Sequence, residues 1–234
     1  MQQYFAKDKD LNLDDGDYHH IKNVMRMKKG DLIKVVFNEV IYTCKLTSVL
    51  DSVAFDVISK EKKSGESISV AVAFALIKEQ KLNYLLQKTT ELGVSSLIPT
   101  VMKRSVVKID KNKEDVKLER WQRICKEASE QSFRNKLPNL KRILTLQDLA
   151  YLDYDLKLLC SLNKNTKNIK KVLQKNNKCV KILLVVGPEG GFEPEEEEYL
   201  LKNGFISVSL GNSVLRAETA PVVALSMINY EFMR

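Results

Sequence analysis

The chain has 234 residues, of which 44% are hydrophobic and 29% charged. This composition is ordinary for a soluble globular protein, and the length allows one large domain or two modest ones. No apolar run approaches the roughly 20 residues that a membrane-spanning helix needs, and we expect neither a signal peptide nor a membrane partner. The four cysteines are scattered and only two histidines are present, so we expect no metal site and reduced thiols in a cytoplasmic protein.

The net charge of +8 is unevenly placed along the chain. Residues 1–68 hold 11 basic and 11 acidic residues, so the whole surplus lies in the remainder. Residues 103–142 alone hold 13 basic and 6 acidic residues, a surplus of +7. A concentrated basic region suits a polyanionic partner such as a nucleic acid, although a solvated lysine-rich face would give the same count.

The first part of the chain has the pattern of a small β-barrel with one helix. A helix is predicted from about Gly16 to Met27, with Asp17 as its N-cap. Runs rich in β-branched and aromatic residues predict strands at 32–37, 41–46 and 53–58.

A polar bridge over residues 61–67 marks the predicted domain boundary, which divides the chain into 1–67 and 68–234. Beyond it, strands and helices alternate. Strands are expected at 69–77, 96–101, 155–160, 181–186 and 206–210, and helices at 78–92, 115–133, 166–174, 195–203 and 218–232. Gly93 fits a helix end. This alternation predicts an α/β domain with a largely parallel sheet.

One glycine-bearing segment, residues 185–192, joins a buried strand to a helix with an acidic first turn. Ligands of parallel sheets bind at the carboxyl ends of strands, and glycines there let the backbone approach a ligand closely. The acidic run argues against a phosphate at this helix. The dinucleotide and nucleoside triphosphate fingerprints are absent, which leaves a Rossmann-type oxidoreductase poorly supported. A tight turn with solvated glutamates is the alternative interpretation.

A second segment, residues 210–220, follows another strand end and opens the last helix. Glu218 and Thr219 suit the cap and first turn of a helix. Arg216 is a cation at a helix N-terminus, where the helix dipole disfavours it. We therefore expect Arg216 to have a partner, which would be Glu218, Glu189 or a ligand.

Together, residues 187–192 and 210–220 resemble the cofactor loops of SPOUT methyltransferases, closest to the ribosomal RNA small subunit methyltransferase E family. Further matches extend this resemblance over almost the whole chain, at residues 20–31, Lys81, 88–93, 104–105, 120–121, 127–132, Arg134 and Pro138. In one departure, this chain has Gln3 where the family often has an arginine near its N-terminus, which would remove one cationic contact.

The resemblance implies a PUA-like RNA-binding β-barrel, an α/β domain with a C-terminal trefoil knot, and a homodimer with cofactor sites near its interface. It implies S-adenosylmethionine as the cofactor and N3 of a uridine in small-subunit (16S) ribosomal RNA as the methyl acceptor. The residues that it assigns to cofactor binding are Gly187, Pro188, Glu189, Gly190, Gly191, Leu210, Gly211, Val214, Leu215 and Ala220.

The remaining roles follow from the chemistry of the implied reaction. Uridine N3 must lose its proton before it attacks, so we expect Arg216 to stabilise the resulting charge and Glu218 to be the weaker candidate for the base. Phe192 would either stack on the target base or, as we favour, pack in the core, where Trp121 is also expected. The residues expected to contact RNA are Arg26, Arg104, Arg120 and Arg134, with ion pairs to nearby glutamates as the alternative.

Two other functions stay open. A SPOUT enzyme could act on another ribosomal or transfer RNA nucleotide with the same fold and cofactor. A non-catalytic RNA-binding factor of ribosome assembly could keep the fold alone, although the two intact glycine-bearing segments argue against lost cofactor binding.

Overall fold

The computed structural model describes residues 1–50, 52–62, 68–163 and 165–232, and the chain groups into two compact units. The first unit consists of Met1–Gly65 and Lys126–Leu137, and the second of Glu66–Cys125 and Pro138–Arg234. The first unit therefore includes a later segment that a boundary at residue 67 would assign to the second. Most of the predicted bridge, residues 63–67, lies outside the described residues.

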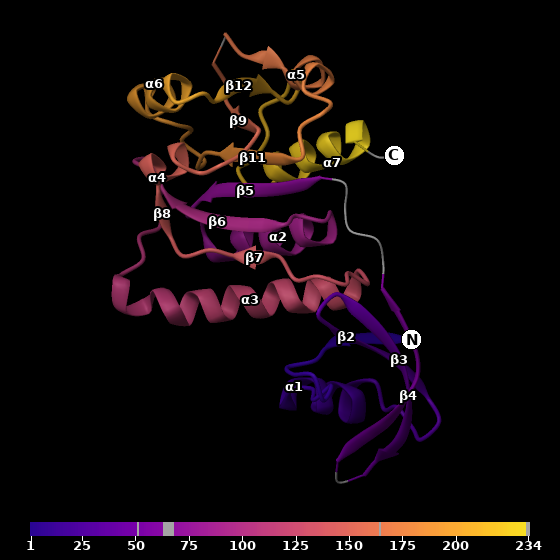
Figure 1. Ribbon diagram of the computed structural model, residues 1–234. Helices are drawn as coiled ribbons and strands as arrows, with labels where there is room; N and C mark the ends of the chain where they lie inside the picture. Colours follow the sequence, from indigo (N-terminus) through magenta and orange to yellow (C-terminus); the bar gives the residue numbers. More distant parts are fainter. Residues whose placement is uncertain (51, 63–67, 164, 233–234) are drawn as a thin grey trace. The chain divides into compact units, whose positions relative to one another are not determined.

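The first unit contains a four-stranded sheet in the order β1-β2-β3-β4 (Figure 1). The strands are β1 (Gln2–Phe5), β2 (Leu32–Phe37), β3 (Val40–Val49) and β4 (Val53–Lys62). β1 pairs with β2 in parallel, and the other two pairs are antiparallel. The three strands expected from β-branched and aromatic runs are present, and the structure adds β1.

The helix of the first unit differs from the prediction. α1 (Asp15–His19) is capped by Asp14, not by Asp17, and continues as a π-helical turn, His20–Val24. The Asp14 carboxylate accepts from the backbone of Asp17 at 2.8 Å, and the Asp17 carboxylate accepts from the backbone of Asp14 at 3.3 Å. This reciprocal capping box explains the error, because Asp17 takes the third helical position of the box.

A partly buried charge cluster fastens Lys126–Leu137 into the first unit. The Lys126 ammonium lies 2.7 Å from Asp14, 2.6 Å from Asp17 and 3.4 Å from Glu130. The Glu130 carboxylate also accepts from the backbone of Phe5 at 3.1 Å, and thus reaches β1. Burial raises the pKa of Glu130 to about 7, although the positive charge of Lys126 opposes this.

The second unit is built on a parallel sheet with the strand order β10-β12-β9-β11-β5-β6-β7, and β8 also pairs with β6. Every pair in this sheet is parallel. The strands are β5 (Ser69–Ala75), β6 (Ser96–Val101), β7 (Asn139–Leu140), β8 (Leu144–Thr145), β9 (Leu156–Cys160), β10 (Lys167–Asn168), β11 (Lys181–Val186) and β12 (Ile206–Ser209). The predicted α/β domain with a parallel sheet is confirmed.

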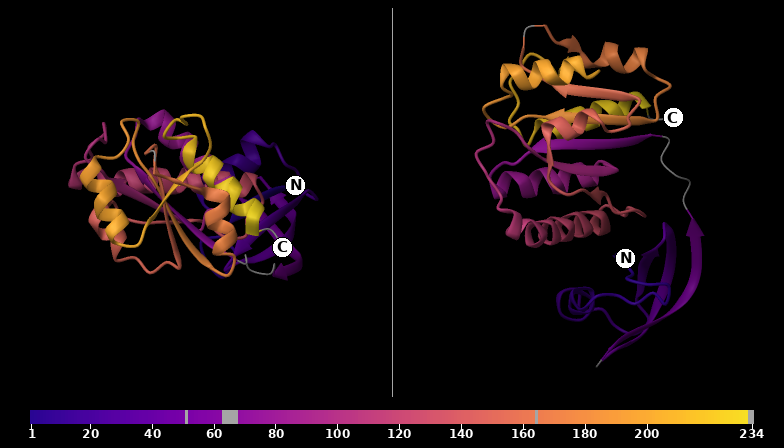
Figure 2. Two further views of the ribbon diagram at one scale, coloured as in Figure 1. Left: turned by 90° about the horizontal axis from the view of Figure 1, so that it is seen from above. Right: turned by 60° about the vertical axis from the view of Figure 1, so that its left-hand side comes forward.

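Helices cover both faces of this sheet, as the view from above in Figure 2 shows. They are α2 (Glu79–Glu91), α3 (Glu114–Gln131), α4 (Leu146–Ala150), α5 (Ile169–Lys175), α6 (Pro194–Lys202) and α7 (Ala220–Phe232), with a short 3-10 turn at Lys111–Lys113. Side chains of β5 alternate between the faces: Val72 and Phe74 pack with α2, α5 and α7, whereas Ala71 and Ala73 pack with α4 and α6.

The structure gives the ends of two helices for which the sequence made a specific prediction. Gly93 follows α2 with a φ of +85°, the left-handed conformation that a helix-terminating glycine adopts. The last helix begins at Ala220, two residues later than predicted, because residues 217–219 form a turn instead.

Trp121 is buried in the core, as predicted. Within the described residues, no helix has the length and apolar character needed to span a membrane.

Candidate functional site

A cavity of about 620 Å³ opens at the carboxyl ends of three neighbouring strands, β12, β9 and β11. It belongs to the second unit. The lining comes from three segments, residues 160–163 after β9, 186–194 after β11 and 208–217 after β12, joined by Lys81, Arg104, Glu197 and Ala220. All ten residues expected to bind a cofactor line this cavity: Gly187, Pro188, Glu189, Gly190, Gly191, Leu210, Gly211, Val214, Leu215 and Ala220.

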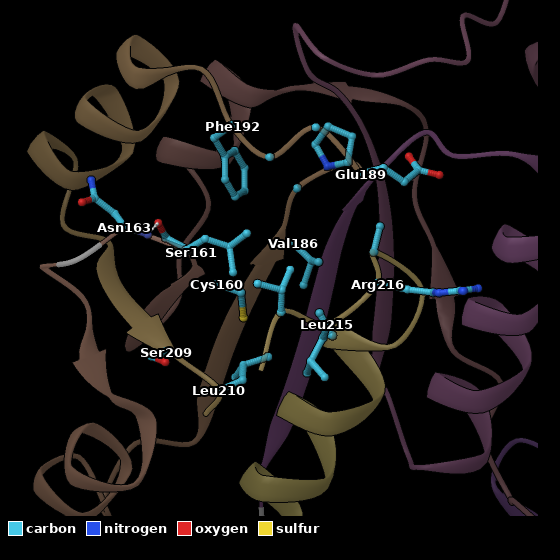
Figure 3. A pocket seen from close by; sticks show the side chains of 18 of the residues that line it. Cys160, Ser161, Asn163, Val186, Glu189, Phe192, Ser209, Leu210, Leu215 and Arg216 are labelled. Carbon is cyan, nitrogen blue, oxygen red and sulfur yellow. Dashed lines mark hydrogen bonds between the residues drawn. The ribbon is translucent and has the colours of Figure 1, made fainter. Parts of the chain in front are cut away.

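The floor of the cavity is apolar. Figure 3 shows Cys160, Val186, Leu210 and Leu215 grouped around its centre, with Phe192 at one side. Cys160 lies at the end of β9, and burial raises the pKa of its thiol to about 12. The thiol is therefore neutral and adds to the apolar floor of the cavity. Phe192 is partly buried, because it lines the cavity and also packs against a core cluster of the second unit. The core position expected for it is therefore found only in part.

Glycines shape the two loops that border the cavity. In the first loop, Gly191 has a φ of +71° and its backbone N–H donates to the carbonyl of Pro188 at 2.9 Å, which closes a tight turn. The ring of Phe192 packs directly over Gly187, so a side chain there would collide with it. Gly211 in the second loop has a φ of +142°, which side-chain-bearing residues rarely adopt.

Two cations that line the cavity, Lys81 and Arg104, hold the first loop in place. Lys81 on α2 donates to Glu189 at 2.8 Å. Burial alone would raise the pKa of Glu189, but the hydrogen bond and charge of Lys81 outweigh it and lower that pKa. Arg104 donates to both carboxylate oxygens of Glu193, at 3.0 and 3.1 Å, and to the carbonyl of Gly190 at 2.7 Å. The loop is therefore fastened at three of its residues.

Arg216 lines the cavity with an exposed side chain. Neither protein partner expected for it is engaged: Glu189 pairs with Lys81, and within the described parts of the chain no ion pair involves Arg216. Figure 3 shows its side chain directed away from Leu210 and Leu215. The structure therefore assigns Arg216 neither of the two carboxylate partners expected from the sequence. Its backbone carbonyl accepts from Thr219 and Ala220, which sets it just before α7.

Glu218 lies in the turn before α7 and is 8% exposed. Its Oε2 is buried and has no hydrogen-bond partner. An unsatisfied buried carboxylate oxygen is costly and calls for an explanation, of which a function is one. The side chain is not part of the cavity lining, unlike Arg216.

The four arginines expected to contact RNA are divided between the two units. Arg26 and Arg134 belong to the first unit, whereas Arg104 and Arg120 belong to the second. Arg26 is exposed and has a φ of +50°. Arg120 pairs with Glu79, and Arg104 pairs with Glu193 as described above.

Gln3, at the position of the departure from the family pattern, is buried in the first unit. Its side-chain amide donates to the backbone carbonyl of Arg134 at 2.5 Å, and its Oε1 has no hydrogen-bond partner. Gln3 therefore ties β1 to the segment that follows α3.

Sequence reasoning missed part of the cavity. Ser161, Asn163 and Glu197 line it, and Cys160 forms part of its floor. The rule that ligands lie at the carboxyl ends of parallel strands would have pointed to the residues after β9, because that strand was predicted. No set of three or more potential metal-ligand side chains gathers in the parts of the chain that the structure describes.

Comparison with known proteins gives the family. Residues 64–229 match a model described as an RNA methyltransferase domain, and residues 13–53 match an RNA methyltransferase PUA domain. The chain is 36% identical to ribosomal RNA small subunit methyltransferase E of Bacillus subtilis, with 99% of this chain and 97% of that protein covered. It is 33% identical to the enzyme of the same name from Mesomycoplasma hyopneumoniae, with 97% and 98% covered.

A solved structure agrees with these sequence relatives. Ribosomal RNA small subunit methyltransferase E from Neisseria gonorrhoeae bound to S-adenosyl methionine superposes with a TM-score of 0.87 at 25% identity, over 98% of this chain and 97% of that one. The sequence and structural relatives agree over nearly the full length. The chain therefore belongs to the ribosomal RNA small subunit methyltransferase E family.

Proposed function

We propose that this protein transfers a methyl group from S-adenosylmethionine to N3 of a uridine in small-subunit ribosomal RNA. The observation that carries the proposal is the cavity at the ends of β9, β11 and β12, which is bordered by both glycine-bearing loops and has Arg216 among its lining residues. Relatives named as small-subunit ribosomal RNA methyltransferases, one of them solved with S-adenosyl methionine, support the cofactor and the class of substrate.

The cavity fits the cofactor in size and character. Its volume of about 620 Å³ lies in the range of about 300–1,000 Å³ that small-molecule sites occupy. The apolar floor suits an adenine ring, and the glycines of both loops leave backbone groups open to it. We assign cofactor binding to the ten lining residues already named, from Gly187 to Ala220, which supply mainly backbone and apolar contacts.

The reaction divides between cofactor and protein. The bound cofactor supplies an electrophilic methyl group on its sulfonium. The protein must favour loss of the proton from uridine N3, because the neutral nitrogen is a poor nucleophile. Arg216 would stabilise the negative charge that then spreads over the carbonyl oxygens of the base. Glu218, with its unpartnered carboxylate oxygen, is our candidate for accepting the proton.

The first unit and the basic arginines are proposed to bind the RNA. The PUA domain match over residues 13–53 supports an RNA-binding role for the first domain, which we assign to residues 1–67 in a PUA-like barrel. Arg26, Arg104, Arg120 and Arg134 are the proposed RNA contacts. For Arg104 and Arg120, contact with phosphate would have to share or replace the present pairing with Glu193 and Glu79.

Three further features belong to the proposal. The C-terminal part of the 68–234 domain would form a trefoil knot, as membership of the family implies. α7 and α5 pack on the same face of the sheet. The protein would act as a homodimer. It would work in the cytoplasm, where the small ribosomal subunit is its partner.

The decisive experiment is methyl transfer from labelled S-adenosylmethionine to ribosomal RNA from a strain that lacks the enzyme. Naked RNA and assembled small subunits are compared, and mass spectrometry locates the product. A single N3-methyluridine in the small subunit is the expected result. Cofactor binding with product in another RNA would reject the proposed substrate but keep the enzyme class. Cofactor binding without product would reject the RNAs tested as substrates and favour another RNA target. Absence of both binding and product would favour a non-catalytic assembly factor.

A further inference from the structure

A carboxylate faces the cavity at the side away from Arg216. Glu197 on α6 lines the cavity, and its two oxygens accept hydrogen bonds from Ser161 Oγ and, at 3.3 Å, from Asn163 Nδ2. Asn163 also donates its backbone N–H to Ser161 Oγ at 3.0 Å. Figure 3 shows Ser161 and Asn163 across the cavity from Arg216. Glu197 is thus held in place by neutral groups.

The structure of α6 does not require this carboxylate. The helix is capped by Glu193 and Glu196, which complete a capping box. Glu196 also accepts from the backbone of Lys103 at 2.8 Å and is buried. Glu197, the next residue, takes no part in the cap, although it stands in the same acidic run.

Glu197 also has no cation paired with it in the described parts of the chain. Three basic residues line the cavity: Lys81 pairs with Glu189, Arg104 pairs with Glu193, and Arg216 lies on the opposite side from Ser161 and Asn163. Among the residues that the structure describes, no ion pair involves Glu197. An ionised carboxylate has about four acceptor positions, and Ser161 and Asn163 use one each. Acceptor capacity therefore remains, in a cavity with few other uncompensated charges.

We infer that Glu197 is a cofactor-recognition residue that accepts hydrogen bonds from donor groups of S-adenosylmethionine, either its ribose hydroxyls or its α-ammonium. This inference rests on the proposed function, since it presumes the cofactor. Hydrogen bonds to an ionised group are about twice as strong as neutral ones, so a single such residue has a measurable share in affinity. Ser161 and Asn163 are then positioning residues, because they act through Glu197.

The test compares Glu197→Gln with Glu198→Gln. Glu198 is the neighbouring glutamate, is exposed, pairs with Lys202 at 2.6 Å and does not line the cavity. Calorimetric titration of the full chain with S-adenosylmethionine should show about tenfold or greater weakening for Glu197→Gln, and little change for Glu198→Gln. Asn163→Ala, which removes one of the two hydrogen bonds to Glu197, should cause a smaller loss and serves if Glu197→Gln does not fold.

Two further ligands identify the donor group. 5′-Methylthioadenosine has the ribose but no amino-acid part, whereas S-adenosylhomocysteine has both. If Glu197→Gln weakens both ligands, the ribose is the donor, and if it weakens only S-adenosylhomocysteine, the ammonium is. Unchanged affinity for S-adenosylmethionine, or an equal loss in Glu198→Gln, would overturn the inference. Failure of the unmodified protein to bind S-adenosylmethionine would instead reject the proposed function itself.

Discussion

The ring of Phe192 lies so close to the α-carbon of Gly187 that a β-carbon at residue 187 would stand 3.0 Å from it. This is closer than ordinary van der Waals contact, and the ring cannot retreat freely because it packs against the core of the second unit. The first loop of the cavity therefore depends on the absence of a side chain at this one position.

We expect Gly187→Ala to weaken S-adenosylmethionine binding by about tenfold or more, since overpacking of this kind costs about 1–3 kcal/mol. The matched control is Gly190→Ala, whose β-carbon would meet the flexible Arg104 side chain at an ordinary 3.4 Å. Calorimetric titration compares the two variants. Phe192→Leu combined with Gly187→Ala should recover part of the affinity, and equal behaviour of the two alanine variants would contradict the steric explanation.

Arg216→Ala should abolish methyl transfer while leaving cofactor affinity within about twofold. Loss of a preorganised donor to developing negative charge typically costs 10²–10³ in turnover. Turnover and cofactor affinity are measured on the same preparations, with Arg142→Ala as the control for removal of a surface arginine. Arg142 is 69% exposed, pairs with Asp115 and lies outside the cavity. Unmodified turnover in Arg216→Ala would reject its catalytic assignment.

Lys81→Met should weaken cofactor binding about two- to fivefold, because a partly exposed ion pair of this kind contributes about 1 kcal/mol. Lys88→Met is a close control on the same helix. Lys88 lies 2.8 Å from Glu91 and has a similar exposure, 35% against 32% for Lys81, but does not line the cavity. The affinity of Lys88→Met should be unchanged. A loss of equal size in both variants would mean that the effect comes from α2 and not from the Glu189 loop.

The stability of the protein should respond to pH through Glu130. Its pKa in the folded protein is raised from 4.5 to about 7, chiefly by burial, so the folded state holds its proton more tightly than the unfolded chain. The contribution of Glu130 to stability is therefore full below about pH 4.5 and is lost as the pH rises to about 7. Other groups titrate in this range too, so the comparison is made between variants.

Urea denaturation of the unmodified protein and of Glu130→Gln at pH 5 and pH 7.5 isolates this effect. The amide resembles the protonated acid but does not titrate, so its stability relative to the unmodified protein should increase between the two pH values. A difference between the two proteins that does not depend on pH would show that Glu130 titrates in the same range folded and unfolded.

Elements with a strong local signal were predicted well. The apolar runs that became β6 and β11 have the predicted bounds, because a central parallel strand is buried on both faces and its sequence shows this directly. The two-residue strands β7, β8 and β10 were not predicted, since they exist only by pairing with β6 or β12. β1 was missed for a similar reason: Gln2 and Gln3 carry no strand pattern, and pairing with β2 defines it.

In the site, too, features with a local sequence signal were predicted and contacts between distant residues were not. The glycine-bearing loops were found because glycine at a strand end is a local feature of the sequence. The Ser161–Glu197 contact joins residues 36 positions apart, so no local pattern could reveal it. Arg104 was selected for its charge, yet its contacts are with Glu193 and Gly190, because the sequence shows how many cations are present but not which carboxylates they meet.

The inclusion of Lys126–Leu137 in the first unit has a consequence for synthesis. Asp17 is almost fully buried, and its cation, Lys126, belongs to a segment made after more than half of the chain. Residues 1–65 leave the ribosome first, and until Lys126 is made, Asp14 and Asp17 lack the cation that pairs with them in the folded unit. The part of the protein that is translated earliest is thus expected to be among the parts that finish folding late, and a fragment ending at the linker should be unstable by itself.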